Sequence, residues 1–309
     1  MIDRPATDRV RELAAARPRP PRPTRGYRAF RIVNALVLSG LVLVTLYPFV
    51  NVVARSLSDE GAINAGRVNL LPVGINVQTY RFVFGDRMFW INYRNTVVYT
   101  VVATAISMVL TTMFAYVLSK RHLRGHRLLL GTALFTMFFS GGLIPNYVLV
   151  TSLGMKNSIW AIALPNAVNV FNLLVMKAFF ENFPAELEEA AEIDGLSTYG
   201  ILLRIVVPLS KAVMATMTLF YSVSFWNSWF AAFIYMDRRE LFPVTVYLRN
   251  IISSASGTAG IGASYEQATQ VGANIQSVTM VLTVVPILLV YPFVQRYFVT
   301  GVMLGAVKG

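Results

Sequence analysis

The amino-acid sequence predicts an all-α membrane protein with six transmembrane helices. Only 14% of its 309 residues are charged and 55% are hydrophobic, and the mean hydropathy is +0.57. A soluble domain would carry about a quarter charged residues. Six uncharged stretches of at least 20 residues are each long enough to cross a hydrocarbon core ~30 Å thick as a helix. We expect spans at about 32–54, 95–119, 128–150, 158–180, 212–236 and 277–297.

The distribution of basic residues predicts that both termini are cytoplasmic. With the N-terminus inside, the segments on that side of the membrane hold 18 of the 27 Lys and Arg residues, and the opposite loops hold 9. Cytoplasmic loops of membrane proteins carry such an excess. The net charge of +12 is therefore mostly a signature of topology, and it does not indicate a nucleic-acid partner.

Residues 1–30 are predicted to be a disordered, basic cytoplasmic arm rich in Pro and Arg, and residues 31–309 to form one transmembrane domain. The arm has too few apolar residues to bury a core, and its charge suits contact with anionic membrane lipid. The apolar run after Arg31 is too long for a cleaved signal peptide.

Two spans carry features that a plain membrane helix does not need. In the third, FSGGLIP at 139–145 should break the helix, either as a packing kink or as a cavity-lining break of the kind that transporters use. In the fourth, Asn166, Asn169 and Asn172 are three residues apart and would share one side of a helix. They could form hydrogen bonds between helices or line a hydrophilic substrate path.

The centre of the fifth span, FWNSWF at 225–230, combines aromatic rings with an amide. Trp226, Asn227 and Trp229 could stack on a sugar ring and hydrogen-bond its hydroxyl groups, or they could simply pack within the membrane. The longest predicted outside loop, 237–275, follows this span and is a candidate binding surface.

An acidic segment lies between the fourth and fifth spans, on the predicted cytoplasmic side. Glu181 to Asp194 holds 6 of the 15 acidic residues and no basic residue. Pro184 suits the first turn of a helix and Gly195 suits a left-handed stop, so we expect a short helix at about 184–195. Ser197 should cap a second short helix that ends near Pro208. Composition alone would indicate a solvated acidic face, whereas the position between two spans indicates a docking site.

The sequence predicts no catalytic site, no metal site and no cofactor bound to this chain. Cysteine is absent, and His122 and His126 lack a third metal ligand nearby. No G-x-x-x-x-G-K-[ST] motif is present, so we expect that this chain does not hydrolyse ATP and is not an enzyme. No acidic residue lies within a predicted span, which argues against a proton-coupled carrier.

The acidic segment resembles the EAA loop of type I ATP-binding-cassette (ABC) importer permeases. The matching positions are Glu189, Ala190, Ala191, Asp194, Gly195, Ile205 and Pro208, and Val207 stands where Leu is usual. Most of residues 30–309 resembles the carbohydrate-uptake permeases that serve complex sugars, including the oligosaccharide and aldouronate group. The segments that carry this resemblance are FSGGLIP, FPAELEEAAEIDG, FWNSWF, YLRNII and the ending GVMLGAVKG.

This resemblance implies a type I ABC importer fold of six helices, in which the helix at about 184–195 is a coupling helix seated in a groove of a cytoplasmic ATPase. It implies that Glu189 pairs with a basic residue of the ATPase, that Ala190 and Ala191 fit the groove, and that Asp194 and Gly195 complete the contact. The implied partners are a second related permease, two ATP-binding subunits that hold ATP and Mg²⁺, and an extracytoplasmic solute-binding protein. The implied function is sugar or oligosaccharide import across a bacterial cytoplasmic membrane by alternating access.

Two other functions stay open on the residues alone. The chain could be a membrane scaffold or channel whose acidic loop recruits a regulator. It could also be the same importer machinery carrying a non-sugar solute, such as an amino acid or peptide. The sequence does not identify the sugar.

Overall fold

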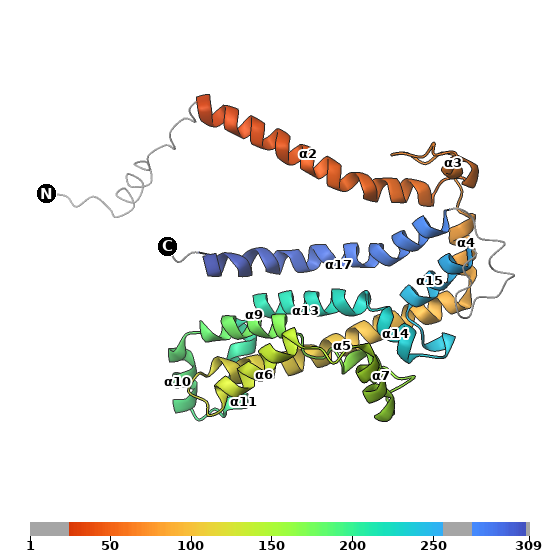
Figure 1. Ribbon diagram of the computed structural model, residues 1–309. Helices are drawn as coiled ribbons and strands as arrows, with labels where there is room; N and C mark the ends of the chain where they lie inside the picture. Colours follow the sequence, from red (N-terminus) through yellow and green to blue (C-terminus); the bar gives the residue numbers. More distant parts are fainter. Residues whose placement is uncertain (1–24, 256–273, 307–309) are drawn as a thin grey trace, which may run out of the picture. The chain divides into compact units, whose positions relative to one another are not determined.

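The computed structural model describes residues 25–255 and 274–306, and every regular element within these ranges is a helix (Figure 1). The predicted all-α class is confirmed for these residues. The chain divides into two compact units, Met1–Asn51 and Val52–Gly309, which are described separately.

The first unit contains most of helix α2 (Arg25–Ser56), which has Pro48 near its end. The predicted span at 32–54 lies inside this helix. The prediction of a disordered arm up to residue 30 is wrong for residues 25–30, which are helical. A helix that already exists extends at little cost through residues such as Arg and Ala, because each added residue forms one more hydrogen bond. The rest of the predicted arm, residues 1–24, lies outside the described residues.

Helix α5 (Arg87–Ser119) is the central helix of the second unit. It packs against α9 (Val170–Glu181), α13 (Lys211–Trp226) and α15 (Val244–Ala255), and Figure 1 shows it running the length of this unit. The helix begins before the predicted start at residue 95, because the side chain of Asp86 caps it and accepts a hydrogen bond from the Met88 amide at 2.8 Å.

The third predicted span is two helices rather than one, α6 (His126–Phe138) and α7 (Leu143–Ser152), with an angle of 117° between them. The break falls within the predicted FSGGLIP segment, and Gly142 there has φ = +83°. A turn of this size is larger than a packing kink. A positive φ is the conformation that glycine adopts without steric cost, so the break depends directly on the residue type.

The fourth predicted span is also interrupted, which corrects the prediction for its three asparagines. A short helix α8 (Trp160–Ala163) is followed by irregular chain, and α9 begins only at Val170. Asn166 lies in the irregular segment, Asn169 caps α9 and Asn172 lies inside it, so the three do not share one side of a helix. The physical reason is that the Asn169 side chain accepts a hydrogen bond from the Asn172 amide at 3.1 Å, which favours a helix start there.

The fifth predicted span is divided into α13 and α14 (Phe230–Tyr235), with Asn227 to Trp229 at the break. The sixth lies within α17 (Ile275–Ala306), which continues through Pro286 and Pro292. By length and composition, two described helices could each cross a membrane, or up to four if each sharply bent pair is one span. The number of six spans therefore stays a prediction.

The remaining helices are short and lie near the two ends of α5 (Figure 1). Near its first residues lie α4 (Gln78–Gly85), α15 and a 3-10 turn at Arg239–Leu241, and α3 (Glu60–Asn64) precedes α4 in the chain. Near its last residues lies α10 (Ala185–Ile193), followed by α11 (Thr198–Ile201). The main hydrophobic cluster between these ends is built from α5, α9 and α13.

Candidate functional site

The predicted acidic helix exists and has the expected ends. Helix α10 begins after Pro184, ends at Ile193 and is followed by Gly195 with φ = +81°. The Leu196 amide donates to the Ala191 carbonyl and the Gly195 amide to the Glu192 carbonyl, both at 3.0 Å. This is the Schellman arrangement that a left-handed glycine permits, so the stop at Gly195 is encoded locally.

The second short helix also starts where the sequence predicts. The Ser197 hydroxyl accepts a hydrogen bond from the Gly200 amide at 3.3 Å and caps α11. The chain then widens into a π-helix at Leu202–Val206 before α12 (Val207–Leu209), which contains Pro208. A widened turn accommodates a proline, whose ring lacks an N–H and clashes with the carbonyl one turn earlier. The helix ends one residue beyond the predicted Pro208, and α13 then begins at an angle of 86° to it.

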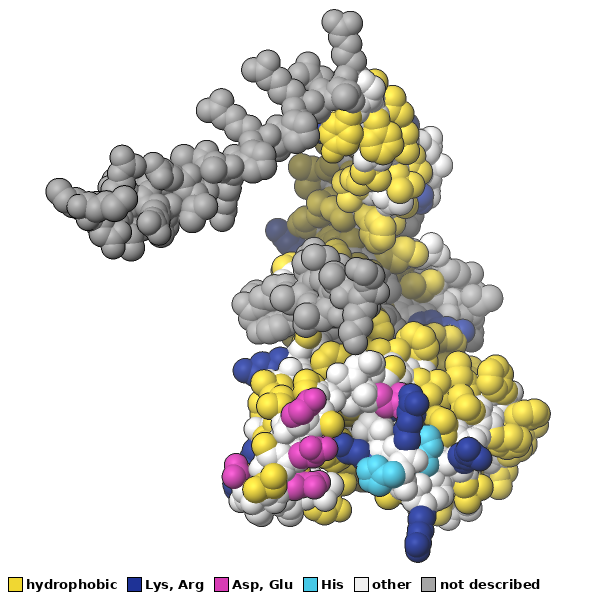
Figure 2. All heavy atoms as spheres, turned by 90° about the vertical axis from the view of Figure 1, so that its left-hand side faces the viewer, with side chains coloured by type: hydrophobic (Ala, Val, Ile, Leu, Met, Phe, Trp, Pro, Cys, Tyr) yellow, Lys and Arg dark blue, Asp and Glu magenta, His cyan; other side chains and the backbone are white. Residues whose placement is uncertain are grey.

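Helix α10 exposes all of its residues except Glu188 and Ala191, and one stripe of this exposed surface, which we call the outward stripe, faces away from those two residues. It consists of Glu186, Glu189, Ala190 and Ile193, which are all exposed and follow the i, i+3, i+4, i+7 spacing of one helix face. Ile193 is 87% exposed. Ile193 was not among the residues predicted to contact a partner, although its helical spacing from Glu189 and Ala190 indicates that the three share one face. In Figure 2 acidic side chains gather at this end of the molecule, close to basic side chains and the two histidines.

The two alanines of the EAA match have different surroundings. Ala191 is buried within the main hydrophobic cluster of this chain, whereas Ala190 lies on the outward stripe. The expectation that both alanines fit a groove on a partner is therefore corrected for Ala191. The cause is helix geometry, because neighbouring residues point in directions about 100° apart.

Beside Gly195 the surface is hollowed. An open groove of about 480 Å³ lies between the end of α10 and the start of the next helical segment. Its lining includes Asp194, Gly195, Tyr199 and Arg204. Two of the residues predicted to contact an ATPase, Asp194 and Gly195, therefore line a concave surface next to the outward stripe, which Glu189 contributes to.

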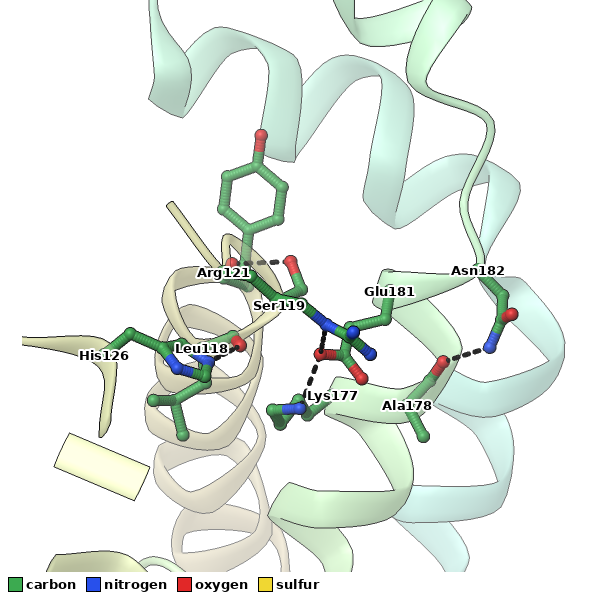
Figure 3. Close-up of polar contacts among 9 residues, drawn as sticks. Leu118, Ser119, Arg121, His126, Lys177, Ala178, Glu181 and Asn182 are labelled. Atoms are coloured by element: carbon green, nitrogen blue, oxygen red, sulfur yellow. Dashed lines mark hydrogen bonds and ion pairs between the residues drawn. The ribbon is translucent and has the colours of Figure 1, made fainter. Parts of the chain in front are cut away.

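Two acidic side chains of the segment point into the molecule instead of into solvent. Glu188 is ion-paired with Lys120, and its Oε2 accepts a hydrogen bond from the Tyr116 hydroxyl at 3.2 Å. Glu181 accepts from Lys177 Nζ at 2.6 Å and from Arg121 Nε at 3.1 Å, as Figure 3 shows. The side chains of Glu188 and Glu181 are only 12% and 15% exposed. The interpretation of the segment as a solvated acidic face is therefore wrong for these two residues.

Burial opposes ionisation of Glu181, yet the hydrogen bonds from Lys177 and Arg121 prevail and lower the pKa of its carboxyl group. Glu181 is thus a carboxylate at neutral pH, held by two cations. Nearby, His126 Nε2 lies 2.9 Å from the Leu118 carbonyl oxygen (Figure 3). Within residues 25–255 and 274–306, no group of three or more possible metal ligands gathers around either histidine or elsewhere.

The residues predicted to line a substrate path lie in two groups. Asn169 and Asn172 meet at the start of α9, where the Asn169 amide also donates to the Tyr221 hydroxyl at 2.9 Å. Tyr221 in turn lies 2.6 Å from the Thr111 hydroxyl of α5. The pair therefore belongs to a polar network between α5, α9 and α13, while Asn166 is exposed in the preceding turn.

The aromatic group lies around the break between α13 and α14. Trp226 Nε1 donates to the Thr283 carbonyl of α17 at 3.1 Å, and Asn227 Nδ2 donates to the Val223 carbonyl at 2.9 Å. In the described parts of the chain, no hydrogen bond or ring contact joins an asparagine of the first group to Trp226 or Trp229. The structure therefore does not bring the predicted path residues into one site.

A cation that was not predicted from the sequence lies beside Trp229. The Arg249 guanidinium carbon lies 3.9 Å from the centroid of the Trp229 ring and 5.4 Å from that of Phe233. Such a contact holds an arginine in place while leaving its N–H groups free to bind an anion. Arg249 lies in the YLRNII segment, 20 residues after Trp229, and no local sequence pattern indicates that the two side chains pair.

Comparison with known proteins places these features in a family. No protein-family model matches the chain. Protein LplC of Bacillus subtilis is 39% identical, and the match covers 93% of this chain and 97% of that protein. The polygalacturonan/rhamnogalacturonan transport system permease protein YtcP of the same organism is also 39% identical, over 90% of this chain and 99% of that protein.

A solved structure has the same fold. The crystal structure of a bacterial ABC transporter involved in the import of the acidic polysaccharide alginate contains a chain with a TM-score of 0.79 to this one. The two are 34% identical, and the match covers 90% of this chain and 100% of that chain. This chain therefore belongs to the membrane-embedded permease subunits of carbohydrate ABC importers.

Proposed function

We propose that this chain forms one half of the membrane pathway of an importer that carries an oligosaccharide into the bacterial cytoplasm by alternating access. The observation that carries the proposal is α10, a short acidic helix that is fixed to the end of α5 on its inner face and exposed elsewhere. ATP and Mg²⁺ are held by separate ATPase subunits. This chain has no catalytic role, and its part is to convert the movement of those subunits into opening and closing of the path.

The proposed assembly contains a second related permease, two ATPase subunits and an extracytoplasmic solute-binding protein. The permease names of the relatives support it, since a permease acts as one component of a transport system. In this assembly α10 and both chain termini lie on the cytoplasmic side, and the membrane is crossed six times. The predicted outside loop at 237–275, of which residues 256–273 lie outside the described residues, faces the binding protein. No nucleic-acid partner is part of it. A scaffold or channel role is not favoured, because the relatives are transport permeases.

Charge alone is too weak to drive the switch. Moving a two-state pathway from 1:99 to 99:1 needs ~5.5 kcal/mol of differential interaction. An exposed ion pair such as one made by Glu189 contributes roughly 0–1 kcal/mol. Burying an aliphatic side chain such as Ile193 contributes about 1.5–3 kcal/mol. The outward stripe should therefore dock mainly through Ile193 and the groove beside Gly195, with Glu189 guiding the orientation.

We further propose that the substrate is an anionic oligosaccharide. Support comes from the alginate importer, whose substrate is an acidic polysaccharide, and from Arg249. Arg249 belongs to α15, which lies at the end of the second unit opposite α10, near the predicted outer surface (Figure 1). Its side chain is exposed. A guanidinium group binds a carboxylate through two parallel hydrogen bonds. Trp229 and Phe233 would hold that group in place at the entrance.

The test is purification of the complete complex with its binding protein, followed by uptake into proteoliposomes. We expect an ATPase subunit to co-purify and carboxylated oligosaccharides to stimulate ATP hydrolysis and uptake. The absence of any ATP-binding subunit, or the absence of stimulation by every sugar tested, would overturn the importer function.

A paired measurement tests the substrate class separately. Arg249→Gln should reduce uptake of a carboxylated oligosaccharide more than uptake of its neutral, esterified form. Arg238→Gln removes an exposed charge from the same predicted side and serves as the control. An equal effect of Arg249→Gln on both sugars would refute the anionic substrate while leaving the importer function intact.

A further inference from the structure

We propose that Glu188, Lys120 and Tyr116 form an anchor that transmits the movement of α10 directly to α5, and we call these three residues the α5–α10 anchor. The proposal rests on the proposed role of α10 as a docking helix. It goes beyond that role by naming the membrane helix that receives the movement and the side chains that pass it on.

The three groups of the anchor contact one another. Glu188 Oε2 is ion-paired with Lys120 Nζ and accepts the hydrogen bond from the Tyr116 hydroxyl. Lys120 Nζ also lies 4.8 Å from the centroid of the Tyr116 ring, so the cation is held by a carboxylate and an aromatic face together. Three mutual contacts restrict the position of Glu188 more than a single surface ion pair would.

Burial distinguishes this contact from an ordinary surface ion pair. The Glu188 side chain is 12% exposed and the Lys120 side chain 29% exposed. Long exposed side chains lose conformational entropy when they pair and are screened by salt. A largely enclosed pair is screened less, so its geometry is better maintained. The α5–α10 anchor therefore fits the requirement of a mechanical link.

The anchor lies on the side of α10 that is opposite to the outward stripe. Glu188 is three residues before the buried Ala191, and the two together form the inner face of α10. On α5, Tyr116 lies in the last turn and Lys120 is the first residue beyond the helix. A force on Ile193 therefore passes across α10 to the last turn of α5. Helix α5 in turn contacts α9, α13 and α15 along its length.

A second contact beside the anchor supplies a matched control. Arg121 follows Lys120 and pairs with Glu181, but its own side chain is 79% exposed. Glu181 keeps a second partner in Lys177, which lies four residues earlier in the same helix. Removing the Arg121 charge therefore leaves Glu181 paired, whereas removing the Lys120 charge leaves Glu188 without its cation.

The decisive experiment compares Lys120→Gln, Glu188→Gln and Arg121→Gln in the complete complex with its ATPase and binding protein. ATP hydrolysis and sugar uptake are measured on the same proteoliposomes. We expect Lys120→Gln and Glu188→Gln to lower the number of sugars imported per ATP by at least about fivefold, the lower end of typical coupling between sites. Arg121→Gln should leave that ratio near the wild-type value, and the reversed pair Lys120→Glu/Glu188→Lys should restore part of it.

An unchanged ratio in Lys120→Gln and Glu188→Gln would overturn the anchor while leaving the importer function standing. Loss of ATPase co-purification or uptake in the wild-type complex would instead overturn the proposed function. If the charge variants fail to assemble, Tyr116→Phe removes only one hydroxyl group and should still lower the ratio, by a smaller factor. A wild-type ratio in an assembled Tyr116→Phe complex would then count against the anchor.

A distance measurement tests the mechanical claim independently of activity. The chain has no cysteine, so spin labels can be attached uniquely through Glu192→Cys on α10 and Val117→Cys on α5, both exposed positions. In the complex we expect one narrow label–label distance that is the same with and without ATP. Lys120→Gln should broaden it. A distance that already changes with ATP in the otherwise wild-type chain would show that the two helices do not move together.

Discussion

The two ends of α5 are held by different kinds of contact. Beyond its last residue, Lys120 and Arg121 pair with Glu188 and Glu181, which belong to other helices. Around its first residues, the ring of Phe89 packs against a group of other aromatic rings and is 1% exposed.

The first end is also fixed through backbone carbonyl groups. Asn95 Nδ2 donates to the Glu240 carbonyl at 2.6 Å, and the Tyr99 hydroxyl donates to the Leu241 carbonyl at 2.8 Å. The Tyr247 hydroxyl donates to Asp86 Oδ2 at 2.5 Å, and burial is the main cause that raises the pKa of this phenol. Burial of apolar rings stabilises the fold through the non-directional hydrophobic effect, whereas an ion pair fixes two particular side chains relative to each other. We therefore expect the contacts at the first end of α5 to contribute most to the stability of the fold. The contacts at its last end should contribute most to the coupling of ATP hydrolysis to sugar uptake.

The largest expected effect is on stability at the aromatic end. Phe89→Ala should lower the free energy of unfolding by about 3–5 kcal/mol, because it removes a fully buried ring and leaves a cavity in its place. Trp90→Ala is the control in the same cluster, since Trp90 is 54% exposed and should cost less. Thermal unfolding of the detergent-solubilised complex measures both. An equal loss of stability in the two variants would contradict the comparison.

The next effect concerns docking at the other end of α5. Ile193→Ala should weaken binding of the ATPase subunit by about 1.5–3 kcal/mol, which corresponds to roughly tenfold to a hundredfold in Kd. Glu189→Gln on the same stripe should cost no more than about 1 kcal/mol. Titration of the ATPase subunit against the permease complex gives both values. A larger loss for Glu189→Gln would mean that charge, and not apolar contact, dominates docking.

A smaller effect tests the turn after α10. Gly195→Ala should lower the free energy of unfolding by about 1–2 kcal/mol, because φ = +81° strains a residue that has a Cβ. Gly131→Ala adds the same methyl group inside α6, where no atom lies within 4 Å, and should stabilise by about 0.5–1 kcal/mol. Thermal unfolding of the two variants should therefore shift in opposite directions. A shift of the same sign in both would show that the added methyl group acts through something other than φ.

The smallest effect is the pH dependence of the ion pairs at Glu181. In the folded chain the pKa of the Glu181 carboxyl group lies below its ordinary value of 4.5. The ion pairs of Glu181 therefore contribute fully to stability above about pH 4.5, and this contribution is lost as the pH falls through the lower pKa of the folded state. Unfolding measured between pH 7 and pH 3 should show this loss in the wild type. Glu181→Gln should lack that part of the dependence, and an identical pH profile in the two proteins would contradict the assignment.

Local features of the fold were predictable because they depend on backbone conformation. Gly142 and Gly195 both adopt the positive φ that their residue type allows, and Ser197 caps α11 as expected. The interruption of the fourth span was not predicted. A cap by Asn169 inside an apolar run competes with helix continuation, and the apolar pattern alone does not show which arrangement is favoured.

By itself, the sequence determined the helical class, the position and ends of α10, and the break around Gly142, since each follows from residues a few positions apart. Only the tertiary structure decided which acids face solvent and which face the bundle. Glu188 and Lys120 are 68 residues apart in the chain, and Ala190 and Ala191 are adjacent, yet Ala190 is exposed and Ala191 is buried. Such choices depend on where other helices lie, and that information is distributed along the chain and is not local to the acidic segment.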